Sequence, residues 1–242
     1  MRIKPSLLLT LAIISVTTTS VFAATDDSLM QRYRHPYQFF VGGSIMAGYS
    51  SMSKNDLSNR VNNPALQAVG NQVTSLSTAS PLLYDIELGL MTSTHFGIDL
   101  AYFYKPNKIN MDIVNQFTQQ TGSASMNLNM TTVGMIADFD IKPKLAFIGK
   151  LGIALIRSNM DFDQNAQKIT KMTSIDATMV SGMASVGLDY VLTPQLILSG
   201  SYMHVLENKN PEEFHTTEYG TIGTGVINPA LDTLGVGLKY YF

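Results

Sequence analysis

Three polar residues near the end of the chain have the types that nucleophilic catalysis requires. Ser201 could supply a hydroxyl nucleophile, His204 a general base and Glu207 the acid that orients the base. In an extended strand, however, residues three apart point to opposite faces, so Ser201 and His204 cannot pair on one strand. The sequence also contains no metal-ligand cluster, phosphate-binding loop or nucleotide motif. It therefore predicts neither an enzyme nor a bound cofactor.

A second set of candidates consists of charged residues embedded in apolar stretches. Glu87 and Asp99 flank one short connection, so they can face each other across a pair of strands. Two facing carboxylates could act as the acid and base of glycoside hydrolysis. The wider set combines carboxylates with lysines: Glu87, Asp99, Asp138, Asp140 and Asp189, with Lys150 and Lys239. What these groups can do depends on the elements that hold them.

Those elements are stretches of about ten residues with alternating apolar and polar side chains, the pattern of membrane β-strands. In residues 82–91, for example, the even positions are apolar, while Asp85, Glu87 and Gly89 would face inward. The stretches are 37–49, 82–91, 96–105, one ending at 141, 145–155, 178–192, 195–206 and 230–242. In the seventh, which is the least regular, Ile197 falls on the inner face. The sequence predicts an all-β fold, an eight-stranded antiparallel up-and-down transmembrane β-barrel.

The links between these stretches alternate strictly between short and long. The long, polar ones are 51–81, 106–125, 158–177 and 207–229. Membrane barrels have tight periplasmic turns and longer extracellular loops, so we expect these four segments outside the cell. Outward aromatic residues also gather near both ends of the strands, as in the girdles of membrane barrels. A soluble β-sandwich or lipocalin-like barrel is the alternative, but it would bury its apolar face.

Composition and the N-terminus indicate export. The 242 residues carry a net charge of -2 with 14% charged residues, which gives no sign of a nucleic-acid surface. There is no cysteine, and therefore no disulfide or thiol nucleophile. A basic start, a short apolar core and small residues up to Ala23 predict a signal peptide over residues 1–23. The barrel domain would then span 24–242, with 24–36 as a short periplasmic segment.

The last strand resembles the terminal strand of outer-membrane proteins, because Gly237, Tyr240 and Phe242 match its glycine, alternating aromatic residues and final Phe. Lys150-Leu151-Gly152 resembles OmpA-like and opacity-type small barrels, and Asn228-Pro229 is similar to the OmpW group. The resemblance implies an outer-membrane location, surrounding lipid and lipopolysaccharide, and recognition by the barrel-assembly machinery. Lipid-A deacylases have a His with a Ser two residues later. That pattern is absent here, because the residue two after His204 is Leu206.

An eight-stranded barrel has an interior just wide enough for side chains to fill, so the inward charges are expected to pair and plug it. Lys150 and Lys239 should contact Glu87, Asp99 or Asp189, with room left by Gly42, Gly134, Gly152 and Gly187. Such a lumen cannot hold a sugar, which argues against glycoside hydrolysis. The leading hypothesis is a non-enzymatic barrel that displays loops for envelope integrity or for contact with a host or surface ligand. A narrow channel for small or apolar solutes is the alternative.

Overall fold

The structure, a computed structural model, describes residues 37–50, 71–78, 82–106, 108–170, 174–207, 212–216, 220–225 and 230–242. The predicted signal peptide and residues 24–36 lie outside this described part, and so does the motif at residues 228–229. Within the described part, no helix has the length and apolar character that crossing a membrane requires.

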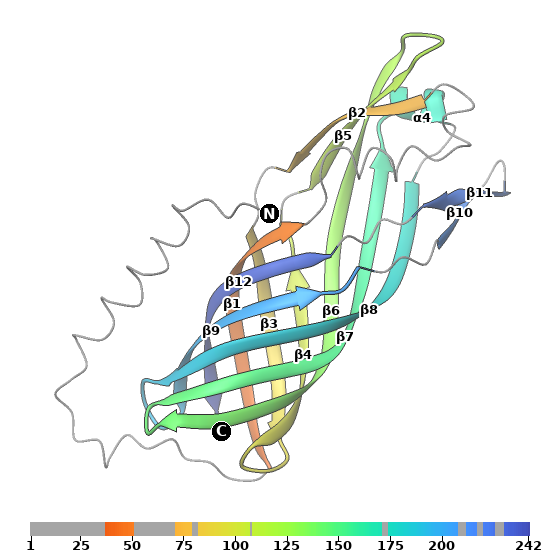
Figure 1. Ribbon diagram of the computed structural model, residues 1–242. Coiled ribbons are helices and arrows are strands. Elements are labelled where there is room, and N and C mark those ends of the chain that lie inside the picture. Colours follow the sequence, from red (N-terminus) through yellow and green to blue (C-terminus); the bar gives the residue numbers. More distant parts are fainter. Residues whose placement is uncertain are drawn as a thin grey trace.

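Eight antiparallel strands close into a barrel (Figure 1). They are β1 (Gln38–Ser50), β3 (Leu82–Met91), β4 (Phe96–Tyr104), β6 (Thr121–Lys142), β7 (Leu145–Phe162), β8 (Ser174–Val191), β9 (Leu196–Val205) and β12 (Leu231–Tyr241). Each pairs with the barrel strand before and after it, and β12 pairs with β1 from Tyr241 opposite Phe40 to Leu231 opposite Ser50, which closes the ring. The predicted eight-stranded up-and-down barrel is confirmed.

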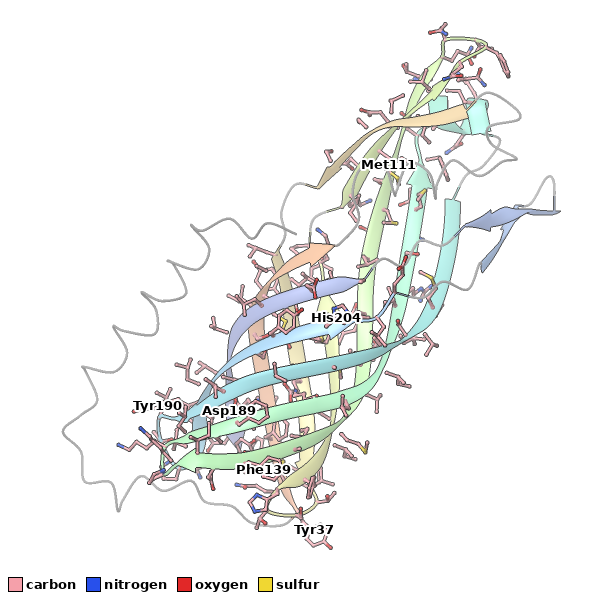
Figure 2. All side chains as sticks on the ribbon, viewed as in Figure 1. Tyr37, Met111, Phe139, Asp189, Tyr190 and His204 are labelled. Carbon is pink, nitrogen blue, oxygen red and sulfur yellow. The ribbon has the colours of Figure 1, made fainter. Side chains whose placement is uncertain are left out.

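The outer face of the barrel is an apolar band. Along β4, every second side chain is exposed and the others are buried. The exposed set includes large apolar residues such as Ile86, Leu100, Met135 and Val236, which are between 47% and 67% exposed. Aromatic side chains lie at the end that carries the short turns, where Figure 2 labels Phe139 and Tyr190. A soluble barrel would bury such a face, whereas lipid covers it in a membrane barrel.

The long connections contain ordered elements, which their polar composition did not predict. Segment 51–81 includes β2 (Asn71–Thr78), and 106–125 includes β5 (Ile109–Asn115) and the start of β6. Segment 158–177 includes α4 (Gln164–Thr170) with the adjoining ends of β7 and β8, and 207–229 includes the hairpin of β10 (Glu212–Thr216) and β11 (Gly220–Gly225). Strands β6, β7 and β8 therefore continue beyond the barrel, and β5 and β2 extend their sheet (Figure 1).

This extension has a small apolar core of its own. We call β2, β5, α4 and the adjoining ends of β6 and β7 the platform. Its buried side chains include Met111, Ile113, Ala124, Met126, Met160, Phe162 and Ala166. Met111 lies opposite Ala124, and Met126 lies opposite Met160, so β5, β6 and β7 contribute to one buried face. Strand pairing also explains why the segment is ordered: β7 pairs with one edge of β6 along most of its length, and β5 pairs with the other edge beyond the end of β4.

Candidate functional site

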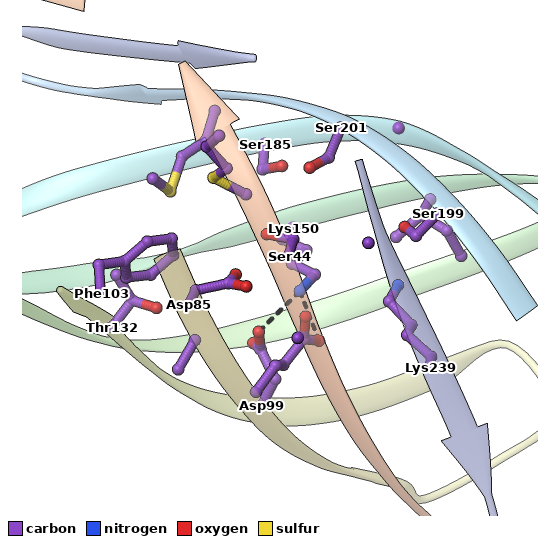
Figure 3. A pocket seen from close by; sticks show the side chains of 18 of the residues that line it. Ser44, Asp85, Asp99, Phe103, Thr132, Lys150, Ser185, Ser199, Ser201 and Lys239 are labelled. Atoms are coloured by element: carbon purple, nitrogen blue, oxygen red, sulfur yellow. Dashed lines mark hydrogen bonds and ion pairs between the residues drawn. The ribbon is translucent and has the colours of Figure 1, made fainter. Parts of the chain in front are cut away.

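Charged side chains from different strands gather in the middle of the lumen (Figure 3). Glu87 comes from β3, Asp99 from β4, Lys150 from β7, Asp189 from β8 and Lys239 from β12. The strands bring them together because side chains alternate between the two faces, and all five occupy inward positions. Glu87, Asp99, Asp189 and Lys239 are all less than a tenth exposed.

Lys150 joins the two carboxylates that flank the turn between β3 and β4. Its Nζ atom donates hydrogen bonds to Oε1 of Glu87 at 2.6 Å and to Oδ2 of Asp99 at 2.9 Å. The Lys150 side chain is only 13% exposed and that of Asp99 1%, so water screens these ion pairs weakly. The facing carboxylates are thus bridged by one cation.

Lys239 forms the second ion pair of the lumen. Its Nζ atom lies 3.2 Å from Oδ2 of Asp189, whose Oδ1 accepts a hydrogen bond of 2.6 Å from the hydroxyl of Ser199. The ammonium group also lies 5.9 Å from the centre of the Phe40 ring, within the range of a cation–π contact.

Two of the four small residues named from the sequence lie directly against charged side chains. A Cβ atom at Gly134 would lie 2.8 Å from Oδ1 of Asp99, and one at Gly42 would lie 3.2 Å from Cγ of Lys239. At Gly152 and Gly187 the nearest atoms are backbone atoms of the adjacent strands. At both positions the absent side chain allows close approach of backbones, and Gly187 also lines the cavity beside Lys150 and Lys239.

Asp85 belongs to the same polar layer, although the sequence analysis left it out of the network. It is 8% exposed and lines a cavity of about 40 Å³ together with Ser44, Asp99, Lys150 and Lys239. Oδ1 of Asp85 and Oδ1 of Asp99 are buried without a protein partner. A cavity of that size holds roughly three water molecules, which can satisfy such atoms. The alternation of residues 82–91 predicts Asp85 on the inward face with Glu87, and the structure confirms that position.

An apolar layer closes the lumen on each side of the charges. Toward the long connections lies a buried cluster that includes Met46, Phe103, Met130, Met183 and Met203. Toward the short turns lies a second cluster of Phe40, Met91, Ile136, Ile148, Ile197 and Tyr241. The alternation predicts polar side chains on the inner face, and these large apolar side chains correct that expectation. Their effect is to separate the charged layer from both openings of the barrel.

Two of the predicted network carboxylates have surroundings different from those of Glu87, Asp99 and Asp189. Asp138 is buried but closer to the short turns, opposite Ile148 on β7, and its backbone N–H donates to the carbonyl of His95 at 2.8 Å. Asp140 is exposed, at the end of β6 where the strand register shifts. Its inclusion in the buried network was wrong, because the alternation continues past the point where the neighbouring strands enclose the lumen.

The residues considered for nucleophilic catalysis are separated by the barrel wall. Ser201 lines the lumen cavity. His204 lies on the outer side (Figure 2), where its Nδ1 is 2.7 Å from Oδ1 of Asp232. The hydroxyl of Tyr202 donates to the same oxygen at 2.5 Å. This outer cluster could not be predicted from the sequence, because Asp232 is distant in sequence and joins it only through the pairing of β9 with β12.

The last strand carries the three residues matched to the assembly signal. Tyr240 and Phe242 face outward with their rings 5.1 Å apart, and the backbone N–H of Phe242 donates to the carbonyl of Phe39 at 3.0 Å. A Cβ atom at Gly237 would lie 2.6 Å from the carbonyl oxygen of Gly43, so this position requires glycine for close strand contact.

The lumen as a whole is suited to stability more than to turnover. Four carboxylates, Asp85, Glu87, Asp99 and Asp189, face two ammonium groups across a space that holds only a few water molecules. Within the described part of the chain, no group of three or more acidic or histidine side chains is arranged to hold a metal ion. The arrangement can bind water and fix the barrel strands to one another, but it offers no room for a substrate.

Comparison with known proteins identifies one family. The outer membrane protein beta-barrel domain family matches the chain over residues 10–242. No curated protein matches it. Among solved structures, the chain is similar to OprG from Pseudomonas aeruginosa, with 12% identity and a TM-score of 0.52; the match covers 87% of this chain and 99% of that one.

Two further barrels are similar at lower scores. Neisserial surface protein A (NspA) has 12% identity and a TM-score of 0.48, with 87% of this chain and 100% of that chain covered. Ail, the attachment invasion locus protein of Yersinia pestis, has 10% identity and a TM-score of 0.45, with 86% and 100% covered. At such low identity, structural likeness concerns the fold alone.

Proposed function

The chain belongs to the outer membrane protein beta-barrel domain family, and from this premise we propose that it is a closed, non-enzymatic barrel that displays its platform at the cell surface. Its location is the outer membrane. The platform would contact a host or surface ligand, and the barrel beneath it would add to the integrity of the envelope.

This proposal rests on the filling of the lumen by side chains. An aqueous pore requires a continuous polar path, but here large apolar side chains lie on both sides of the charged layer. Ile197 is fully buried on one side and Val205 on the other. The space between them is about 40 Å³, far below the interior of a wide porin. These features favour a scaffold over the alternative, a narrow channel for small or apolar solutes.

The platform supports the second half of the proposal. Binding residues concentrate on connections that a rigid scaffold holds in place. Here β6 and β7 run without interruption from the barrel into the platform, so barrel and platform share two long strands. Such continuity fixes the platform relative to the membrane, which is what a surface for binding needs.

Planar-bilayer recording tests whether the lumen conducts. Purified, folded protein should produce no conductance steps, while an open porin inserted under the same conditions provides the positive control. Uptake of small apolar solutes into proteoliposomes should equal that of protein-free vesicles. Steady single-channel steps or faster uptake would favour the channel instead. Incubation with lipid A, followed by mass spectrometry, should show no change in lipid mass, and loss of an acyl chain would reveal an enzyme.

A further inference from the structure

A polar pocket lies on the outer face of the sheet, away from the lumen. It is lined by Asn127 and Asn129 of β6 and by Arg157 and Asn159 of β7, and its volume is about 220 Å³. Asn127 lies opposite Asn159, and Asn129 lies opposite Arg157, so the four side chains form two adjacent cross-strand pairs. They occupy the same outward positions that carry apolar side chains lower on both strands.

The pocket begins where the apolar band ends. From Ile141 to Thr131, β6 takes ten residue steps, which at about 3.3 Å per residue and a tilt of about 40° gives roughly 25 Å of height. The apolar band of outer-membrane barrels is about 25 Å tall. Asn129 and Arg157 form the next outward pair after Thr131 and Leu155. They are therefore at the level of the lipid headgroups, at the end with the long connections.

An aromatic residue marks the same level independently. Tyr104 of β4 lies opposite Asn129 and is 49% exposed. Tyrosine is enriched where the hydrocarbon of a membrane meets its polar boundary, since the ring suits lipid and the hydroxyl suits water. Tyr104, Asn129 and Arg157 thus form one row at the interface across three neighbouring strands.

The pocket lining includes one charged side chain, that of Arg157. Arg157 is exposed, and no ion pair joins it to any carboxylate whose side chain the structure describes. Asp161 lies four residues further along β7 on the same face, and its Oδ2 atom is 3.8 Å from Nζ of Lys108. An exposed guanidinium group can bind a phosphate with two parallel hydrogen bonds.

We propose that Asn127, Asn129, Arg157 and Asn159 bind the phosphorylated sugar headgroup of a lipopolysaccharide molecule in the outer leaflet. Arg157 binds the phosphate. The asparagine amides both donate and accept hydrogen bonds, which matches the hydroxyl and amide groups of a glucosamine sugar. A glycerol phospholipid offers the phosphate but few of the other groups. The acyl chains then descend along the apolar face between Val133 and Ile153, which are both about half exposed.

Native mass spectrometry of the folded protein in detergent can test this site. We would add purified lipid A, phosphatidylglycerol or inorganic phosphate in separate experiments and measure the bound fraction. The unmodified protein should retain one lipid A. Arg157→Gln should weaken retention about tenfold, as expected for loss of a charge-assisted hydrogen bond. Lys168→Gln provides the matched control, because it removes one positive charge from the exposed face of α4 and should retain lipid A normally.

A second variant, Asn129→Ala, keeps the charge and should weaken lipid A more than phosphatidylglycerol. It also preserves the test if Arg157→Gln does not reach the folded, heat-modifiable form. Equal retention of lipid A by the unmodified protein and both variants would overturn the site. Equal retention of phosphatidylglycerol and lipid A would overturn the sugar specificity. Displacement of lipid A by millimolar inorganic phosphate would show a general anion site and overturn the proposed ligand. None of these outcomes bears on whether the lumen conducts.

Discussion

The ammonium group of Lys150 lies 2.6 Å from Oε1 of Glu87, at the centre of a lumen that apolar side chains close on both sides. Removing one partner of such a buried pair leaves the other charge without compensation, which costs about 3–5 kcal/mol. Lys150 has two carboxylate partners, so its loss would strand both Glu87 and Asp99.

Lys150→Met should therefore lower the free energy of unfolding by about 3–5 kcal/mol, seen as a lower urea midpoint for the barrel in lipid vesicles. Lys142→Met is the control, because Lys142 is exposed at the short turn between β6 and β7, and its midpoint should match that of the unmodified protein. The channel alternative makes a different prediction for Lys150→Met: an unchanged midpoint with altered conductance. That result, together with steady conductance of the unmodified protein, would contradict a plugged scaffold.

Gly134 and Gly200 give a paired test of packing inside and outside the barrel. A methyl group at Gly134 would meet Oδ1 of Asp99 at 2.8 Å and Cε of Met183 at 3.1 Å, whereas nothing lies within 4 Å at Gly200. Gly134→Ala should destabilise the barrel by about 1–3 kcal/mol, the usual cost of overpacking. Gly200→Ala should leave the urea midpoint unchanged. Equal midpoints for the two variants would mean that the charged layer can move aside.

The barrel could be predicted from sequence because the alternation of side chains is repeated on every strand. In residues 82–91, the period of two determines both the face of each side chain and the strand bounds, which the structure reproduces as Leu82–Met91. The alternation also placed Lys150 on the same face as the carboxylates. It could not say how far the closed part of the barrel extends along each strand, which is why Asp140 was wrongly assigned to the interior.

The platform and the outer polar clusters could not be predicted because they depend on pairing between distant segments. Met111 is a scattered methionine in a polar stretch until β5 pairs with β6 and buries it opposite Ala124. Asp232 likewise meets His204 only through the register of β12 with β9. Register is a property of two strands, and neither strand alone specifies its partner.

Protease treatment of intact cells tests the orientation that the alternating connection lengths predict. Cleavage should occur only within segments 51–81, 106–125, 158–177 and 207–229, since these should lie outside the cell. Lys142 and Lys144, in the turn between β6 and β7, should be protected until the outer membrane is opened. Lysed cells provide the control that these lysines can be cut. Trypsin cleavage at either lysine in sealed cells would reverse the orientation.

Deletion of Phe242 tests the terminal assembly signal. Phe242 is 74% exposed, so its ring adds little to the packing of the folded barrel. If the barrel-assembly machinery recognises Phe242, its deletion should lower the amount of heat-modifiable protein in the outer membrane. The barrel should still refold from urea in vitro. Substitution of the neighbouring exposed aromatic position, Tyr240→Phe, keeps the alternating aromatic pattern and should assemble normally. Unchanged folded yield after deletion of Phe242 would show that the resemblance has no role in assembly.

Asp163 links α4 to the rest of the platform, and its variants test whether the platform is held in place. One carboxylate oxygen of Asp163 accepts a hydrogen bond of 2.6 Å from the backbone N–H of Ala166, and the other accepts one of 2.9 Å from the hydroxyl of Ser123 on β6. Asp163 thus caps the helix and joins it to the sheet. Asp163→Ala should weaken the helix by about 0.5–2 kcal/mol, measured as faster hydrogen exchange of α4 amides at pH 7. Asp163→Asn keeps a good capping group and should exchange nearly as slowly as the unmodified protein.

The same contact has a definite dependence on pH. The N–H of Ala166 is the main cause that lowers the pKa of Asp163, and the Ser123 hydrogen bond adds to it. A carboxyl group with a lowered pKa in the folded state stabilises that state above its unfolded pKa, and this contribution disappears as the pH falls through the folded pKa. The difference in α4 exchange between the unmodified protein and Asp163→Ala, corrected for intrinsic rates, should thus be constant near neutral pH and shrink below about pH 4. A difference that persists undiminished at pH 2 would show that the ionised carboxylate does not hold the helix in place.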